Sequence, residues 1–277
     1  MSQPTSNRPY PVLFIHGLWI HASAWDPWQQ LFQANGYLTS APGWPGDGDT
    51  VKETRDDPSP LDGVGILAIC RHYADLIEAM PVKPIVVGHS FGGLIAQELL
   101  ANGYASGRGH RPGSDQGGQG AAVLPAPVGV PGPGHPANKK RTVSLTSKQF
   151  RYSFGNTLTE EESDALFAKW TIPGPGRPLF EDATASFVKD SPAAVDSHHA
   201  IRGPLLLVSG TEDHTVPRSV TEAVFKLYAD NPSITDYREL DGRGHSLTID
   251  GGWQDVAELT LDWIAEQEPA MAAATDH

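Results

Sequence analysis

One short motif in this sequence carries a residue type that attacks acyl groups. Gly88-His-Ser-Phe-Gly92 places a serine between two glycines. It follows the apolar run Ile85–Val87 and precedes a helical pattern, which is the strand–turn–helix setting of a nucleophile elbow. Small residues two positions before and after the serine let strand and helix approach closely. The motif therefore predicts that Ser90 is a nucleophile; the alternative is a surface serine on a glycine-rich turn.

A serine hydroxyl needs a general base, and that base needs an acidic group to orient it. Asp213 follows the buried-strand pattern Pro204–Ser209, and His245 follows the last strand pattern in a glycine-containing loop. Both positions fall at the carboxyl ends of strands, where sites form in open α/β sheets. The chain order Ser, Asp, His is that of enzymes whose serine lies on a nucleophile elbow. We expect His245 as the base and Asp213 as the orienting acid, with Glu212 as the alternative acid.

Acyl transfer also needs backbone N–H groups aimed at the developing oxyanion. One donor is expected from Phe91, directly after the nucleophile. The other is expected from the loop His16-Gly17-Leu18-Trp19, which follows the first predicted strand. Leu18 is the expected donor in that loop, in preference to Trp19. His16 is then expected to shape the loop through hydrogen bonds and not to take part in catalysis.

The elements that must position these residues alternate between strand and helix patterns from residue 10 to residue 265. Short apolar runs such as Pro11–Ile15 are typical of strands covered on both faces. The pattern predicts an α/β fold, with a mainly parallel central sheet flanked by helices on both faces. We expect the core to be discontinuous, formed by residues 8–103 and 201–266.

Two segments interrupt this alternation. Sixteen of the 36 residues from Gly103 to Asn138 are glycine or proline, above the roughly 25–30% that is typical of disorder-prone sequence. We therefore expect residues 104–141 to form a flexible connection with one weak core strand near residues 121–124. Residues 142–200 lack a strand pattern and begin a helix with the capping box Thr159–Glu162, so they are expected to form a small helical lid.

Aromatic residues of the lid and of the core loops are candidates for a substrate pocket. The alternative for each of them is simple packing of the lid against the core. The residues expected to line the pocket are Trp19, His89, Phe150, Phe154 and Trp170.

Composition and charge exclude several other classes of function. The net charge is −13 and no long basic run is present, so we expect no nucleic-acid partner. No apolar run approaches the ~18 residues of a membrane span, and no leader peptide is recognised. The single cysteine, Cys70, fits a core position in a reducing, cytoplasmic compartment. No metal-ligand spacing is found, so no metal is expected. The sequence makes no prediction about oligomeric state.

The sequence resembles the α/β-hydrolase family, in its compact, lidded, bacterial serine-esterase form. The resemblance spans residues 12–262 and rests on these motifs: Phe14-Ile-His-Gly17, Val87-Gly-His-Ser-Phe-Gly-Gly93, Gly210-Thr-Glu-Asp213 with Val216-Pro217, and Gly244-His245. It implies that Ser90 is the nucleophile, His245 the base and Asp213 the orienting acid. It also implies a lid inserted after the family's sixth strand.

A serine nucleophile limits the reactions that can be expected of this sequence. Dehalogenases and epoxide hydrolases of this family carry aspartate at that position, so Ser90 argues against both. We expect hydrolysis of carboxylic esters of small or medium apolar substrates through an acyl-enzyme, without a cofactor. A C–C bond hydrolase, a lactonase or thioesterase, and a cofactor-free perhydrolase are alternatives on the same residues. A non-catalytic ligand receptor is an alternative of a different class.

Overall fold

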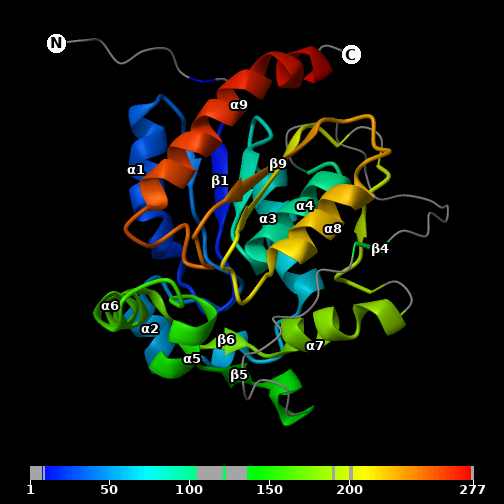
Figure 1. The fold of residues 1–277 in the computed structure, drawn as a ribbon. Coiled ribbons are helices and arrows are strands. Elements are labelled where there is room, and N and C mark those ends of the chain that lie inside the picture. The colour runs from blue at the N-terminus through cyan, green and yellow to red at the C-terminus, as the bar shows by residue number, and fades with distance from the viewer. Residues whose placement is uncertain are drawn as a thin grey trace.

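Two groups of parallel strands form the centre of the molecule, and helices cover them (Figure 1). The computed structural model describes residues 8, 10–104, 121–122, 136–188, 191–199 and 202–275. In the first group, β1 (Val12–Ile15) lies between β2 (Thr39–Ser40) and β3 (Ile85–Gly88). In the second group, β8 (Leu205–Gly210) pairs with β9 (Thr235–Leu240). This arrangement confirms the predicted α/β fold with a mainly parallel sheet.

Strand β1 is covered on both faces, as its unbroken apolar sequence predicts. All four of its residues are buried, and they divide between two hydrophobic clusters: Leu13 and Ile15 in one, Val12 and Phe14 in the other. The division arises because successive side chains of a strand point to opposite faces.

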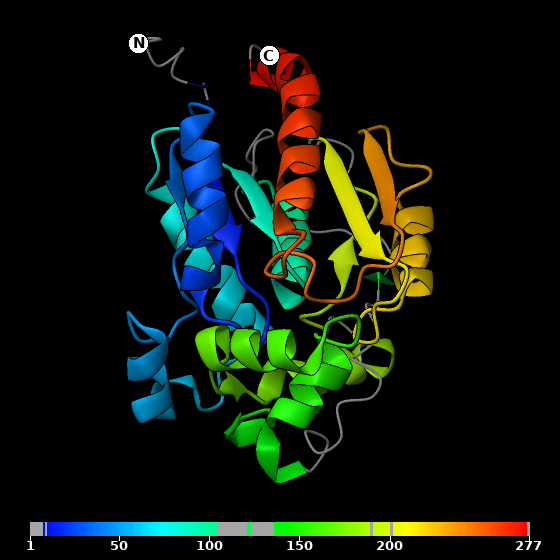
Figure 2. The same ribbon diagram turned by 60° about the vertical axis from the view of Figure 1, so that its left-hand side comes forward.

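A pair of helices packs against each face of β1. The cluster around Leu13 includes residues of α3 (Ile66–Glu78) and α4 (Phe91–Ala101). The cluster around Phe14 includes residues of α1 (Asp26–Ala34) and α9 (Trp253–Thr275). Figure 2 shows these two helical layers on opposite sides of the strands.

The helices that cover β1 begin directly at the elements before them. Helix α1 begins at Asp26, because the 3₁₀ turn η1 (Ala22–Trp25) runs directly into it. Helix α4 begins at Phe91, immediately after the serine. Helix α9 is the C-terminal helix and ends at Thr275. The remaining helices around the core are α2 (Val51–Asp56), η2 (Ser59–Leu61) and α8 (Arg218–Leu227).

The described part of the core strand expected near residues 121–124 pairs outside the central sheet. Strand β4 (Ala121–Ala122) pairs in antiparallel fashion with β7 (Val195–Asp196), outside both parallel groups. Val123 and Leu124 lie outside the described residues. Residues of β3 and β8 line a cavity.

Helices and short strands form an insertion at the end of the molecule toward which the strands point (Figure 2). We call residues 142–188 the helical insertion. The predicted capping box at Thr159 and Glu162 is confirmed, and a second one joins Thr146 and Gln149. The elements of the insertion are β5 (Thr142–Val143), α5 (Ser147–Ser153), α6 (Glu160–Trp170), β6 (Gly174–Pro175), α7 (Arg177–Ala183) and η4 (Ala185–Phe187), preceded by η3 (Pro136–Lys140). The paired two-residue strands β5 and β6 were not expected from the sequence.

Within the described part of the chain, no helix combines the length and the apolar character needed to cross a bilayer.

Candidate active site

Ser90 lies on a strained turn between β3 and α4. Its φ is 57° and its ψ is −124°, and it is one of two non-glycine residues with positive φ in the described chain. Such a conformation costs on the order of 1–3 kcal/mol and persists only where the surroundings impose it. The surroundings here require glycine. A Cβ at position 88 would lie 2.1 Å from the carbonyl oxygen of Gly92, and one at position 92 would lie 2.2 Å from that of Ile15.

His245 and Asp213 form a buried pair across two loops. Nδ1 of His245 donates to Oδ2 of Asp213 over 2.7 Å. The other carboxylate oxygen accepts the backbone N–H groups of Thr215 (2.7 Å) and Val216 (2.8 Å). Burial opposes ionisation of Asp213, but the contact with His245 and the backbone hydrogen bonds outweigh it, so the pKa of this carboxyl is lowered. The pair therefore holds a carboxylate against the Nδ1 side of the imidazole.

The opposite nitrogen of His245 is left open. Its Nε2 is buried and has no hydrogen-bond partner among the described residues, so Ser90 and His245 are not hydrogen-bonded in this structure. Ser90, Asp213 and His245 nevertheless line the same cavity. Hydrogen bonds of this kind are often long or unmade in the absence of substrate. The structure thus brings the three predicted residues to one cavity and joins two of them directly.

His89, expected in the pocket, lines this cavity and also supports His245. Burial, followed by the electrostatic interaction with the His245 ring, lowers the pKa of His89 to about 3. The ring is therefore neutral at physiological pH, and its Nε2 donates to the carbonyl oxygen of His245 over 2.9 Å. The two ring centroids lie 4.7 Å apart. His89 thus helps to hold the backbone that carries His245.

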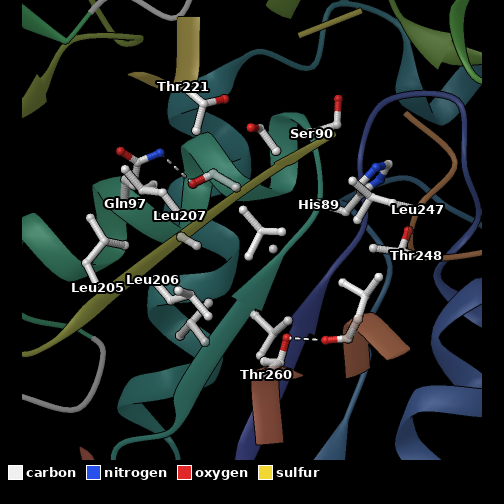
Figure 3. A pocket seen from close by; sticks show the side chains of 18 of the residues that line it. His89, Ser90, Gln97, Leu205, Leu206, Leu207, Thr221, Leu247, Thr248 and Thr260 are labelled. Carbon is white, nitrogen blue, oxygen red and sulfur yellow. Dashed lines mark hydrogen bonds between the residues drawn. The ribbon is translucent and has the colours of Figure 1, made fainter. Parts of the chain in front are cut away.

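The cavity occupies the space between β3 and β8 and has a volume of about 240 Å³, far more than the ~10–15 Å³ that holds one water molecule. Figure 3 shows His89 and Ser90 at one end, Thr260 at the other, and Leu205–Leu207 along one side. The hydroxyl of Ser90 points beyond the carboxyl end of β3 in this view. Apolar side chains from both strands and from α9 make up much of the lining. An apolar substituent next to Ser90 fits such a lining.

The loop that carries the expected oxyanion donor packs directly on the nucleophile. A Cβ at position 17 would lie 2.8 Å from Cβ of Ser90. In the described structure the backbone N–H groups of Leu18 and Phe91 donate no hydrogen bond to another protein group, so both remain available to an acceptor. Trp19 is the second non-glycine residue with positive φ, at 69°.

His16 makes hydrogen bonds that shape this loop. Its Nδ1 donates to the carbonyl oxygen of Gly17 over 2.9 Å, and its Nε2 lies 3.0 Å from Oδ2 of Asp47. The ring stacks on Trp44, whose backbone N–H donates to the same Asp47 oxygen. Both members of the His16–Asp47 pair are buried. Asp47 was not among the residues singled out from the sequence, where its only signal is a place in the turn-rich segment 42–48.

The other expected pocket residues do not line this cavity. Trp19, Phe150 and Phe154 are buried in the hydrophobic core, and Trp170 is partly buried beside Lys169. Only Phe154 reaches a predicted catalytic residue, with its ring edge-on to His245 at a centroid distance of 4.7 Å. Trp19 and Phe150 are members of one hydrophobic cluster and Trp170 packs against it, and the expectation that they line a substrate pocket stays a prediction.

Three histidines of the described chain lie in loops away from the core. His214 and His198 are exposed, and His199 is partly exposed. Across the residues that the structure places, no three His, Cys, Asp or Glu side chains gather closely enough to hold a metal ion.

Comparison with solved structures shows the same fold. A monoacylglycerol lipase from Paleococcus ferrophilus matches with a TM-score of 0.64 and 19% identity, covering 93% of this chain and 96% of that chain. An extracellular alpha/beta-hydrolase from a Paenibacillus species matches with a TM-score of 0.60 and 21% identity, over 92% and 98% of the two chains. An Arabidopsis methylesterase matches with a TM-score of 0.57 and 18% identity, over 92% and 99%.

Sequence comparison assigns the family. No curated protein sequence matches this chain significantly. Residues 12–259, which contain all three predicted catalytic residues, match the alpha/beta hydrolase family. The chain therefore belongs to the alpha/beta hydrolase family.

Proposed function

We propose that this hydrolase cleaves carboxylic esters of small or medium apolar substrates, with Ser90, His245 and Asp213 as its catalytic residues. One observation carries the proposal. The buried hydrogen bond between Asp213 and His245 leaves Nε2 of the imidazole unpartnered at a cavity that Ser90 also lines. An unpartnered basic nitrogen beside a strained serine is the arrangement that activates a hydroxyl nucleophile.

The proton transfers follow from the orientation of His245. Because Nδ1 donates to Asp213, the neutral imidazole accepts at Nε2. As Oγ of Ser90 attacks the ester carbonyl carbon, its proton passes to Nε2 and the carbonyl π electrons move onto oxygen. Collapse of the tetrahedral species breaks the bond to the alcohol, which leaves with that proton. Water then attacks the carbonyl carbon of the acyl-enzyme and gives a proton to Nε2. Breakage of the bond to Oγ of Ser90 releases the acid, and the proton on Nε2 returns to Oγ.

The developing oxyanion is stabilised by the N–H groups of Leu18 and Phe91. Phe91 directly follows Ser90, and Leu18 directly follows Gly17, which packs against Ser90. Neither N–H donates to another protein group in the described structure. Donors of this type contribute ~10²–10³ each to the rate. Gly17 supports this role, because its missing side chain allows the loop to approach Ser90.

Apolar ester substrates are favoured by the cavity lining and by the neighbours. Leucine and valine side chains of β3 and β8 extend the cavity away from Ser90. The solved structures that resemble this chain are named as a monoacylglycerol lipase, a methylesterase and pyrethroid hydrolases. We infer that this chain likewise accepts esters with apolar groups.

Labelling with a fluorophosphonate probe, combined with a series of p-nitrophenyl esters of increasing acyl length, tests this proposal. The probe is expected to label the wild type and Ser59→Ala, in which an exposed serine outside the site is removed, and to leave Ser90→Ala unlabelled. Folded wild-type protein that resists the probe would refute a serine hydrolase and favour a receptor. Labelling of Ser90 without turnover of any ester would refute the esterase and favour the alternatives on the same residues.

A further inference from the structure

The end of α5 is bound to the two loops that carry Asp213 and His245. The hydrogen bonds that join them are Thr215 Oγ1 to Ser153 O (2.7 Å), Ser246 N to Phe154 O (3.2 Å), Asn156 Nδ2 to Glu212 O (2.7 Å) and His214 Nδ1 to Tyr152 O (3.3 Å). The last carbonyl groups of a helix have no partner within it. Groups next to the proposed acid and base supply those partners here, and Phe154 adds its ring contact with His245.

The far side of the helical insertion is bound to residues 16–21 after β1, which carry the expected donor Leu18 and are called the oxyanion loop below. His21 N donates to Trp170 O over 3.0 Å, and Ile172 N donates to Trp19 O over 2.9 Å. These two bonds flank an isolated antiparallel bridge between Ile20 and Thr171. Residues 170–172 of the insertion are therefore joined to the loop after β1 by backbone hydrogen bonds, as in an antiparallel strand pair.

The Trp19 side chain adds a third bond on this side. Its indole Nε1 donates to the carbonyl oxygen of Val143 over 2.9 Å, and the side chain is buried. Trp19 directly follows Leu18 and has a positive φ of 69°. A bulky residue in this conformation is strained and needs surrounding contacts to hold it. The contacts that hold it come from the helical insertion.

We propose, on the basis of the serine-hydrolase function above, that the helical insertion is a fixed brace rather than a lid that opens during turnover. One set of its hydrogen bonds positions the loops that carry Asp213 and His245. The other set positions the loop that carries Leu18. Trp19 is the positioning residue on the oxyanion side, and Thr215 is the positioning residue on the acid–base side. Neither residue touches the reacting atoms; each acts through the loop it anchors.

A reversible disulfide between the insertion and the oxyanion loop tests whether the brace must move. Because the flanking bonds make Ile20 and Thr171 a non-hydrogen-bonded antiparallel pair, their Cα atoms are about 4.5 Å apart, within the range that a disulfide spans. The test variant combines Ile20→Cys and Thr171→Cys with Cys70→Ala, and the last of these removes the only native thiol. Thiol titration under oxidising and reducing conditions follows bond formation.

The oxidised and reduced forms of this variant are compared for fluorophosphonate labelling and ester turnover. We expect the two rates to agree within threefold. A larger loss of either rate on oxidation, restored by reduction, would contradict the proposal that the insertion stays fixed. Failure of the disulfide to form would also contradict it. Labelling of the reduced form tests the serine-hydrolase proposal by itself. A failure of that proposal is therefore distinguishable from a failure of the proposal that the insertion stays fixed.

Two conservative variants test the positioning residues without the disulfide. Trp19→Phe removes the bond to Val143, and Thr215→Val removes the bond to Ser153. Each is expected to lower kcat about five- to twentyfold with KM within twofold, because a catalytic group is displaced while the apolar cavity is unchanged.

The matched controls are Trp253→Phe and Thr184→Val. Trp253 lies outside the cavity lining, and Thr184 makes a comparable hydroxyl-to-carbonyl bond to Phe180 away from the site. Both controls are expected to retain wild-type kcat. A lower Tm with unchanged kcat in Trp19→Phe and Thr215→Val would assign these residues a purely structural role and overturn the proposal.

Discussion

Gly17→Ala is the most direct test of how the oxyanion loop meets the nucleophile. The added Cβ would lie 2.8 Å from Cβ of Ser90 and 2.9 Å from the carbonyl oxygen of His89. Ordinary van der Waals contact begins at 3.4 Å, so the loop and the elbow must separate by about 0.6 Å. The His89 contact is with backbone, which has little freedom to yield.

The expected cost follows from that displacement. A misplacement of ~1 Å in a catalytic constellation costs roughly 10²-fold in rate, so a shift of about 0.6 Å is expected to lower kcat by about 10- to 50-fold. The Leu18 N–H moves with the loop, and its contribution is realised in the transition state. KM should therefore change little, and kcat and kcat/KM should fall together.

The assay compares kcat and KM on one p-nitrophenyl ester with the rate of fluorophosphonate labelling and with Tm. Gly251→Ala is the matched control, because a Cβ there meets no atom within 4 Å; this substitution should leave kcat unchanged. A folded Gly17→Ala protein whose kcat stays within twofold of wild type would refute the proposed contact between the loop and the reacting centre.

Two further predictions concern the buried titratable groups. Asp213→Asn should keep the two backbone hydrogen bonds but lose control of the His245 tautomer, lowering kcat by ~10⁴-fold; a loss below tenfold in steady-state assays would exclude Asp213 as the orienting acid and favour Glu212. His89 has a pKa of about 3 in the folded protein and ~6.5 when unfolded. The unfolded chain therefore takes up a proton first, so the free energy of unfolding should fall as the pH drops from about 6.5 toward 3. His89→Gln should weaken this pH dependence in urea titrations, and an unchanged dependence would contradict the assignment.

Local backbone requirements made the elbow recognisable from sequence. Gly88 and Gly92 are needed because carbonyl oxygens lie 2.1 and 2.2 Å from where a Cβ would be. A requirement of this kind acts on a few adjacent residues, so it leaves a pattern in the sequence. The apolar run of β1 is similar, because burial on both faces excludes polar side chains from consecutive positions.

The expected core strand and the expected pocket depend on information that short sequence patterns do not carry. Ala121 and Ala122 can form a strand in many settings, and their pairing with Val195 and Asp196 depends on which edge is within reach. An aromatic residue is likewise favoured in a pocket or in a packed core. Phe150 of the helical insertion and Trp19 of the loop after β1 are buried in one hydrophobic cluster, which neither residue's own sequence context specifies.

The contacts that support the site were beyond sequence reasoning. The hydroxyl of Thr215 reaches the carbonyl oxygen of Ser153, 62 positions earlier, and the Trp19 indole reaches the carbonyl oxygen of Val143, 124 positions later. A backbone carbonyl is present at every residue, so no residue type marks it as a partner. The same holds for Asp47 beside His16, where one carboxylate among many becomes the partner only through folding.

The sequence by itself determined the fold class, the strained turn at Ser90 and the order in which the candidate nucleophile, acid and base follow one another. Each of these depends on short-range geometry or on burial periodicity, which restrict the residue types that neighbouring positions accept. Only the tertiary structure decided that Asp213 bonds Nδ1 of His245 and leaves Nε2 open. It also decided that a cavity lies between β3 and β8, and that the helical insertion is hydrogen-bonded to the loop that carries Asp213 and to the loop that carries Leu18 and Trp19. These features depend on distances between segments remote in the chain, which only the packed fold sets.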